Sequence, residues 1–160
     1  MLLNTQEFAN FVSNGPLISI DICIQKKRKI LLGKRKNSPA KNFYFVPGGR
    51  IIKDEKIDDA IVRLLISEIG YKFKKNNIKN RKFIGFFEHF YKDNFQGNTK
   101  YGTHYVVLSF LIDHSNIEKI VNVNKNIEQH SKYIWYCLDK KEPENLKIHK
   151  YALDYIKELQ

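Results

Sequence analysis

The stretch "VPGGRIIKDEKIDDAIVRLLISEIG", residues 46–70, joins a glycine-rich turn to a helical pattern of apolar residues. The double glycine after Pro47 interrupts the preceding strand, and Gly70 ends the apolar pattern where a C-terminal glycine is expected. The pattern between them predicts a helix from about Lys56 to Ile69. A glycine-rich turn that carries arginines is suited to a diphosphate.

Strands and helices are predicted on both sides of this stretch. Alternating or apolar patterns predict strands at residues 17–25, 30–35, 43–46, 81–91, 103–113 and 132–138. A capping box at Asn4 and Glu7 predicts a first helix that stops at Gly15 and Pro16, and an amphipathic pattern predicts a last helix over residues 144–159. The expected fold class is therefore α/β, a mixed sheet with helices on its faces.

The first predicted strand has two distinct faces. Ile18, Ile20, Ile22 and Ile24 fall on one face, whereas Asp21 falls on the other. The last helix has an apolar stripe, which predicts its contact with the sheet. The members of that stripe are Leu146, Tyr151, Leu153, Tyr155 and Ile156.

Composition limits the class of protein. A chain of 160 residues that is 42% hydrophobic and 13% aromatic suits one globular domain, residues 1–160. Its apolar runs are shorter than the roughly 18–20 residues that cross a bilayer, and its N-terminus lacks the pattern of a signal peptide. Cys23 and Cys137 are isolated in the sequence, as expected for reduced thiols in the cytoplasm.

The net charge of +11 comes mostly from lysine. The chain is also rich in Asn and Ile, a composition typical of AT-rich genomes, so we do not expect a nucleic-acid partner. Arginine is scarce, and Arg35, Arg50 and Arg63 all lie in or near the opening stretch. The planar guanidinium suits phosphate oxygens better than a lysine does.

Five residues of the opening stretch have the spacing of a known motif. Gly49, Glu55, Arg63, Glu68 and Gly70 stand in the pattern G-x5-E-x7-R followed by "LLISEIGY". This pattern resembles the box of the Nudix hydrolases. The resemblance implies an α/β/α sandwich around a mixed sheet.

The box departs from the usual pattern at two positions. Glutamates usually stand where this chain has Leu64 and Ser67, and both positions share a helix face with Glu68. Three glutamates on that face could hold several Mg²⁺ ions. One glutamate can hold a single Mg²⁺ if the substrate diphosphate supplies other oxygens. The usual carboxylate base is lost as well.

The same departure occurs in the branch of GDP-mannose mannosyl hydrolases, also called GDP-mannose glycosyl hydrolases. The chain is similar to that branch along nearly its whole length, in stretches such as "EFANFV", "PLISID", "YFVPGGR", "FFEHFYKDNFQG", "THYVVLSF" and "EQHSKY". The resemblance implies metal ligands at the Gly49 carbonyl, Glu68 and Gln129, a general base at His130, and diphosphate contacts from Arg35 and Arg50. It implies further site residues at Asp21, Arg63, His89, Tyr91, Tyr105 and Tyr133.

This resemblance implies a reaction and a cofactor. With Mg²⁺, or Mn²⁺ as the alternative, water would attack the anomeric carbon of GDP-mannose or GDP-glucose and release GDP and the inverted sugar. An imidazole at His130 could accept the proton near neutral pH. The resemblance also implies a homodimer.

Other readings of the same residues remain open. Glu55 and Arg63 could form an ion pair that clamps the loop onto the helix, or Arg63 could act directly. Asp21 could hold a sugar hydroxyl or orient another group, and Tyr91 could grip the substrate or belong to the core. The whole chain could instead be a pyrophosphohydrolase that cuts the P–O–P bond of a nucleotide sugar, or a non-catalytic nucleotide or RNA binder.

Overall fold

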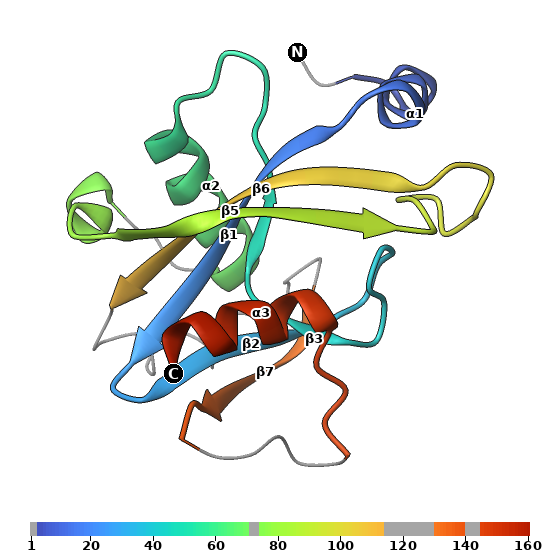
Figure 1. The fold of residues 1–160 in the computed structure, drawn as a ribbon. Coiled ribbons are helices and arrows are strands. Elements are labelled where there is room, and N and C mark those ends of the chain that lie inside the picture. The colour runs from blue at the N-terminus through green and yellow to red at the C-terminus, as the bar shows by residue number, and fades with distance from the viewer. Residues whose placement is uncertain (1–2, 71–73, 114–129, 140–144) are drawn as a thin grey trace.

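The computed structural model describes residues 3–70, 74–113, 130–139 and 145–160, and these residues form a mixed sheet with helices around it (Figure 1). The strands are β1 (Leu17–Lys26), β2 (Lys29–Arg35), β3 (Tyr44–Phe45), β4 (Gly48–Arg50), β5 (Lys82–Tyr91), β6 (Thr103–Asp113) and β7 (His130–Cys137). The helices are α1 (Thr5–Asn14), α2 (Ile57–Ile69) and α3 (Lys150–Leu159), with a short 3-10 helix, η1 (Lys75–Ile78).

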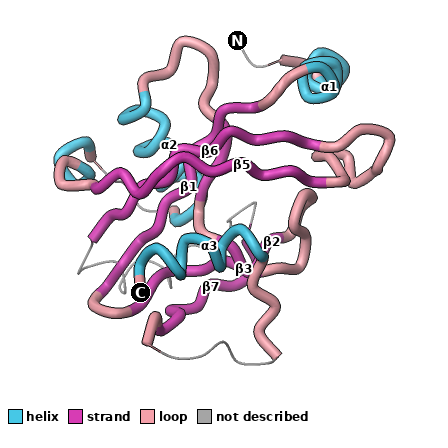
Figure 2. The backbone as a smooth tube through the Cα atoms, in the orientation of Figure 1, coloured by secondary structure: helices cyan, strands magenta, loops and turns pink. Residues whose placement is uncertain are grey.

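The sheet is built around β1. The strands follow the order β3-β2-β1-β6-β5, with β4 paired to β1 and β7 paired to β2. β1 runs parallel to β6 over their whole length, from the pair of Leu17 and Tyr105 to the pair of Gln25 and Asp113. The other pairings, including the long β5–β6 hairpin, are antiparallel. Figure 2 shows the strands between α2 and α3.

Both faces of the sheet are covered, which confirms the predicted α/β architecture. Ile20, Ile22 and Ile24 are fully buried in a cluster with α2. Cys23, on the opposite face of β1, packs in a second cluster with α3. Because side chains alternate along a strand, Asp21 points to the same side as Cys23, towards α3.

The helix boundaries agree with the sequence signals at two places. Asn4 and Glu7 form the predicted capping box, in which the Glu7 N–H donates to Asn4 Oδ1 and the Asn4 N–H donates to Glu7 Oε2. Gly70 ends α2 with φ of 76°, in the left-handed region that favours glycine. The predicted helix of residues 56–69 is therefore confirmed within one residue.

Three predicted boundaries were wrong. The last helix begins at Lys150 rather than at residue 144, because Ile148 forms a parallel bridge to Tyr44 and His149 caps the helix. β7 begins at His130, two residues before the predicted strand. The double glycine does not simply interrupt the chain, because β4 contains it and pairs with β1. In all three cases the pairing is long-range, so local patterns carried no sign of it.

Two further expectations concern the whole chain. Within the described residues, no helix is long and apolar enough to cross a membrane. Cys23 and Cys137 are both free thiols, and Cys23 is buried.

Candidate functional site

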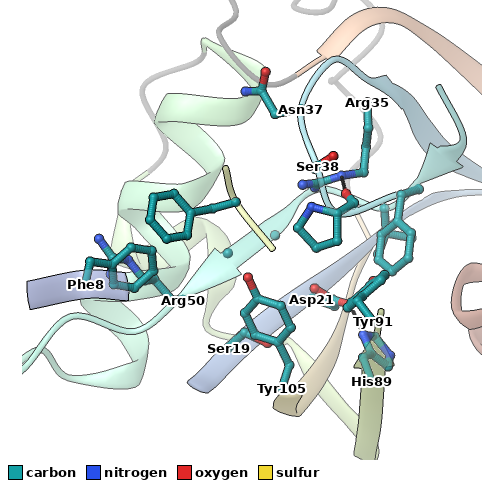
Figure 3. Close-up of a pocket in the computed structure, with 16 residues that line it drawn as sticks. Phe8, Ser19, Asp21, Arg35, Asn37, Ser38, Arg50, His89, Tyr91 and Tyr105 are labelled. Atoms are coloured by element: carbon teal, nitrogen blue, oxygen red, sulfur yellow. Dashed lines mark hydrogen bonds and ion pairs between the residues drawn. The ribbon is translucent and has the colours of Figure 1, made fainter. Parts of the chain in front are cut away.

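A cavity of about 310 Å³ lies on the α3 side of the sheet (Figure 3). It is lined by residues from α1, from the six strands β1 to β6, and from the loops after β2, β3 and β5. They are Phe8, Ser19, Asp21, Arg35, Asn37, Ser38, Pro39, Phe45, Val46, Gly48, Gly49, Arg50, His89, Tyr91, Phe95 and Tyr105. Its lining includes the predicted residues Asp21, Arg35, Gly49, Arg50, His89, Tyr91 and Tyr105.

Asp21 and His89 form the polar end of this cavity. The Tyr155 hydroxyl donates to Asp21 Oδ2 over 2.6 Å and lies 3.1 Å from His89 Nε2. Burial raises the pKa of Asp21 to about 7, although the Tyr155 hydrogen bond and Arg35 partly oppose that rise. Burial also lowers the pKa of His89 to about 3, so this imidazole is neutral at physiological pH.

The other end of the cavity is cationic and aromatic. The Arg50 guanidinium lies 3.9 Å from the ring centre of Phe8, a cation–π contact that fixes its plane. The Phe8 ring in turn contacts Phe95 at 4.7 Å between centroids. Figure 3 shows Arg50 and Phe8 together, apart from the group of Asp21, His89 and Tyr91.

Arg35 and two tyrosines complete the lining. The Nε of Arg35 donates to the Pro39 carbonyl over 2.9 Å, and within the described part of the chain its other guanidinium nitrogens make no hydrogen bond. Tyr91 and Tyr105 meet edge to face at 6.1 Å between ring centroids. Burial raises the pKa of both phenols, so both are neutral hydrogen-bonding groups. Two guanidinium groups, two phenols and a carboxylate suit a ligand with phosphates and hydroxyls.

The ion pair of Glu55 and Arg63 is present in the structure. Arg63 Nε and Nη2 donate to the two Glu55 oxygens over 2.6 and 2.8 Å, and Nη2 also donates to the Arg50 carbonyl over 3.0 Å. The Arg63 hydrogen bond lowers the pKa of Glu55. Arg63 therefore fixes the backbone that presents Arg50 and does not itself line the cavity.

Glu68, His130 and Tyr133 form a second group, on the α2 side. His130 Nδ1 lies 2.9 Å from Glu68 Oε2 and 3.1 Å from the Tyr133 hydroxyl, and that hydroxyl also donates to the Glu68 carbonyl. Glu68 and His130 are 1% and 3% exposed. Among the described residues, Glu68 Oε2 and His130 Nε2 have no hydrogen-bond partner with acceptable geometry. We call these three residues the buried cluster.

The buried cluster fits part of a cation site. In the part of the chain that the structure describes, the group close to Glu68 Oε2 is His130 Nδ1, in poor hydrogen-bond geometry. A buried carboxylate oxygen of this kind is a ligand atom that Mg²⁺ or Mn²⁺ takes. The described residues contain no group of three or more His, Cys, Asp or Glu side chains that could hold an ion by themselves. Gln129, the third predicted ligand, lies outside the described residues.

The two box positions without glutamate differ in their surroundings. Leu64 is 3% exposed, and its Cδ2 lies 2.7 Å from where a Cβ on Gly49 would be. Ser67 is exposed, and its hydroxyl donates to the Leu64 carbonyl over 3.1 Å. An apolar group therefore fills the space between α2 and Gly49, and Glu68 is the one box carboxylate on this turn of α2.

Several residues at the site had not been predicted, among them Tyr155, Phe8 and Phe95. Tyr155 had been placed on the apolar stripe of the last helix, and nothing in that pattern marks its hydroxyl. Phe8 and Phe95 stand within stretches that carry the family resemblance, but aromatic residues there are expected in any core. Only the contacts in the structure distinguish these three residues from ordinary core residues.

Comparison with known sequences gives the family. The profile of the NUDIX domain matches residues 16–156. The low-salt glycan biosynthesis protein Agl8 of Haloferax volcanii is 37% identical over 114 residues, which cover 70% of this chain and 69% of that protein. The ADP-ribose pyrophosphatase of Methanocaldococcus jannaschii is 42% identical over 55 residues, 34% of this chain and 32% of that protein.

Solved structures share the fold. A MutT NUDIX hydrolase from Burkholderia pseudomallei superposes with a TM-score of 0.68 at 20% identity, covering 92% of this chain and all of that one. The NUDIX domain of Shewanella oneidensis NrtR, solved with ADP ribose, gives 0.63 at 16% identity over 98% of this chain and 96% of that one. At these identities the likeness concerns the fold alone.

Proposed function

Because the chain belongs to the NUDIX domain family and is a Nudix-type hydrolase, we propose that it hydrolyses a GDP-sugar to GDP and free sugar. GDP-mannose is the substrate that we propose first, and GDP-glucose is the second. Water attacks the anomeric carbon, and the sugar is released with inversion. The proposal rests on the box departure together with the lining of the cavity.

The position of Leu64 is the observation that carries this proposal. Its side chain packs against Gly49, where a further carboxylate would otherwise face the glycine-rich turn. Attack on phosphorus needs a water that is deprotonated and held beside a crowded anionic centre. Attack on the anomeric carbon needs a stabilised leaving group and a base near the sugar. A helix with one box carboxylate suits the second reaction better.

The lining of the cavity suits both halves of such a substrate. Arg35 and Arg50 offer forked donors to the diphosphate. Asp21 supplies an acceptor for a sugar hydroxyl, and the neutral phenols of Tyr91 and Tyr105 can donate or accept. Charge that develops on the departing diphosphate would be stabilised by the two guanidinium groups.

The buried cluster supplies the proposed cation ligand and base. A divalent cation held by Glu68, the Gly49 carbonyl and Gln129 would neutralise charge on the leaving diphosphate. His130 is the proposed base, because its Nδ1 faces Glu68 and its Nε2 lacks a partner among the described residues. Nε2 would take the proton from water, while Nδ1 stays beside Glu68.

Two further parts of the proposal rest on the resemblance. We propose that the protein is a homodimer, and sedimentation analysis at several protein concentrations tests this. We also propose a cytoplasmic location, in agreement with the free thiols Cys23 and Cys137. The similarity to Agl8, a protein of glycan biosynthesis, supports a substrate that carries a sugar.

The second candidate is a pyrophosphohydrolase that cleaves the P–O–P bond. The similarity to an ADP-ribose pyrophosphatase over residues that cover 34% of the chain favours it. This reaction would use the same arginines for the diphosphate. Its products differ, since it would release a sugar phosphate and GMP.

A panel of nucleotide sugars with Mg²⁺ and with Mn²⁺ tests the proposal. Four substrates should be supplied in parallel: GDP-mannose, GDP-glucose, ADP-ribose and ADP-glucose. The products are then separated and identified by mass spectrometry. We expect GDP and free sugar from the GDP-sugars. Release of GMP and a sugar phosphate would favour the second candidate instead, and binding without turnover would indicate a non-catalytic protein.

A further inference from the structure

Tyr155 contacts two residues of the cavity without lining the cavity itself. It lies on α3 and is fully buried. Its hydroxyl donates to Asp21 Oδ2 over 2.6 Å and lies 3.1 Å from His89 Nε2. One phenol from the last helix therefore connects an acid on β1 with an imidazole on β5.

The direction of these two hydrogen bonds follows from the count of protons. A phenol has one proton, and the Tyr155 hydroxyl donates it in a hydrogen bond to Asp21, its closer partner, when that carboxylate is ionised. The contact with His89 must then be a donation from Nε2–H to the phenol oxygen. Because His89 is neutral, its Nδ1 carries a lone pair. The phenol thus selects one tautomer of His89.

The phenol has little freedom to move. Its ring meets Phe87 edge to face at 4.7 Å and Phe45 at 6.4 Å between centroids. One helical turn earlier, Tyr151 stacks on His89 at 4.0 Å and ties α3 to β5, since its hydroxyl accepts from the Phe90 N–H and donates to the Phe90 carbonyl. The position of the Tyr155 hydroxyl is therefore set by the packing of α3.

Each partner of Tyr155 keeps one acceptor atom free of this contact. Because Tyr155 binds Oδ2 of Asp21, Oδ1 remains as the second acceptor, beside Gly48. A Cβ on Gly48 would lie 2.5 Å from Oδ1, so this oxygen packs directly against the glycine backbone and a larger residue there would displace it. On His89, the atom left is Nδ1. The Nδ1 atom lies 4.0 Å from Asp21 Oδ2, beyond hydrogen-bond distance. Both residues line the cavity, and both atoms can accept hydrogen bonds from hydroxyl groups.

We propose that Tyr155 is a positioning residue for the sugar, which holds Asp21 and His89 so that Oδ1 and Nδ1 accept hydrogen bonds from sugar hydroxyls. This inference rests on the proposed function, because it assigns the sugar of the GDP-sugar to the Asp21 end of the cavity. The diphosphate then lies towards Arg35 and Arg50. A purely structural role for the phenol would affect folding and would affect all ligands alike.

The test compares Tyr155→Phe with Tyr151→Phe. Both variants remove one buried hydroxyl from α3 and keep the aromatic ring. In the described part of the fold, the Tyr151 hydroxyl binds only the backbone of Phe90 on β5, and not a side chain of the cavity. We would measure kcat and KM with GDP-mannose, the inhibition constant of GDP, and thermal unfolding. Tyr155→Phe should lower kcat/KM by about 10–100-fold, the scale of a lost hydrogen bond to a charged group, and should change GDP inhibition by less than about twofold.

The outcomes separate the two roles. A selective loss for GDP-mannose that is about tenfold or more larger in Tyr155→Phe than in Tyr151→Phe would support the positioning role. Equal losses for GDP-mannose and GDP, or no loss for either, would overturn it. If the wild type released no sugar from any GDP-sugar, the proposed function would fail, and equilibrium titration of GDP-mannose against GDP with both variants would still decide the role of Tyr155.

A second measurement uses the unaltered chain, so it does not depend on the folding of a variant. Nitrogen NMR of labelled protein distinguishes the two neutral tautomers of His89, and His89→Ala assigns the signal. Above about pH 7, where Asp21 is ionised, we expect the proton on Nε2, as the Tyr155 contact then requires. A proton on Nδ1 would overturn the proposal, because that atom could not accept from a sugar hydroxyl.

Discussion

The cavity and the buried cluster differ in exposure, charge and position in the fold. The cavity is open, lies on the α3 side and carries two arginines, whereas Glu68 and His130 are enclosed on the α2 side. Gly48 and Gly49 of β4 lie between them, with Gly48 against Asp21 and Gly49 against Leu64. Under the proposed function, substrate recognition and chemistry would be built from separate elements that meet at β4.

This division has kinetic consequences. If the cavity binds the substrate and the buried cluster performs the chemistry, variants of the cluster should act mainly on kcat and on the metal requirement. Variants of the cavity should act mainly on KM. A cavity variant that acts mainly on kcat, or a cluster variant that acts mainly on KM, would contradict this division.

The largest effect is expected for His130→Ala. Loss of a general base lowers turnover by about 10²–10⁴-fold, so kcat with GDP-mannose should fall by that factor while KM changes little. His104→Ala, on β6, is the control, since His104 stacks on Phe90 outside the cavity. Thermal unfolding would show that the variant is folded. A folded variant that keeps more than about a tenth of the wild-type rate would exclude His130 as the base.

Glu68→Gln should raise the Mg²⁺ concentration that gives half-maximal activity. The substitution keeps the shape of a buried side chain but removes its charge. Because few other ligands are proposed for the cation, we expect this Mg²⁺ concentration to rise by about 10–100-fold. Activity as a function of Mg²⁺ measures this shift. The matched variant Glu88→Gln changes an exposed glutamate of β5. The same Mg²⁺ dependence in both variants would remove Glu68 from the metal site. Gln129→Ala should act in the same direction.

Arg50→Lys tests the cavity, because Arg50 belongs to its lining. Lysine keeps the positive charge that would stabilise the departing diphosphate, so kcat should stay within about twofold. It loses both the forked donors and the stacking on Phe8, so KM for GDP-mannose should rise about tenfold. The control is Arg28→Lys, because Arg28 is half-exposed and pairs with Asp139 away from the cavity. A loss of kcat at unchanged KM would place Arg50 with the chemistry.

The smallest effect concerns stability and pH. Burial raises the pKa of Asp21 from 3.8 to about 7, so between these values the folded chain holds a proton that the unfolded chain has released. This carboxyl therefore lowers the free energy of unfolding as the pH rises from about 4 to 7. His89 acts in the opposite direction, so the measurement is the difference between wild type and Asp21→Asn in urea unfolding at several pH values. Parallel curves would show that the pKa of Asp21 is not raised.

The sequence predicted the parts of the fold that local chemistry determines. The capping box at Asn4, the end of α2 at Gly70 and the two faces of β1 follow from side chains close in the chain. The parallel pairing of β1 with β6 and the strand at Gly48 depend on contacts between distant segments. Local patterns carry no information about such pairs, which is why the start of the last helix was also misplaced.

The same distinction applies to the candidate site. The spacing of Gly49, Glu55, Arg63 and Glu68 identified the box, and the structure shows the ion pair of Glu55 with Arg63. A hydroxyl in an apolar stripe, as at Tyr155, gives no sign of the partner that it meets. This partner, Asp21, is brought to the hydroxyl by the packing of α3 against the sheet.

Hydrolysis in heavy-oxygen water tests the central claim most directly. The claim is that the bond between the anomeric carbon and oxygen is cleaved, because Leu64 and Ser67 leave α2 with one box carboxylate for chemistry at phosphorus. Mass spectrometry of both products after a single turnover locates the label. We expect label in the free sugar and none in GDP. Label in a phosphate group would contradict it and would assign the chain to the pyrophosphohydrolases.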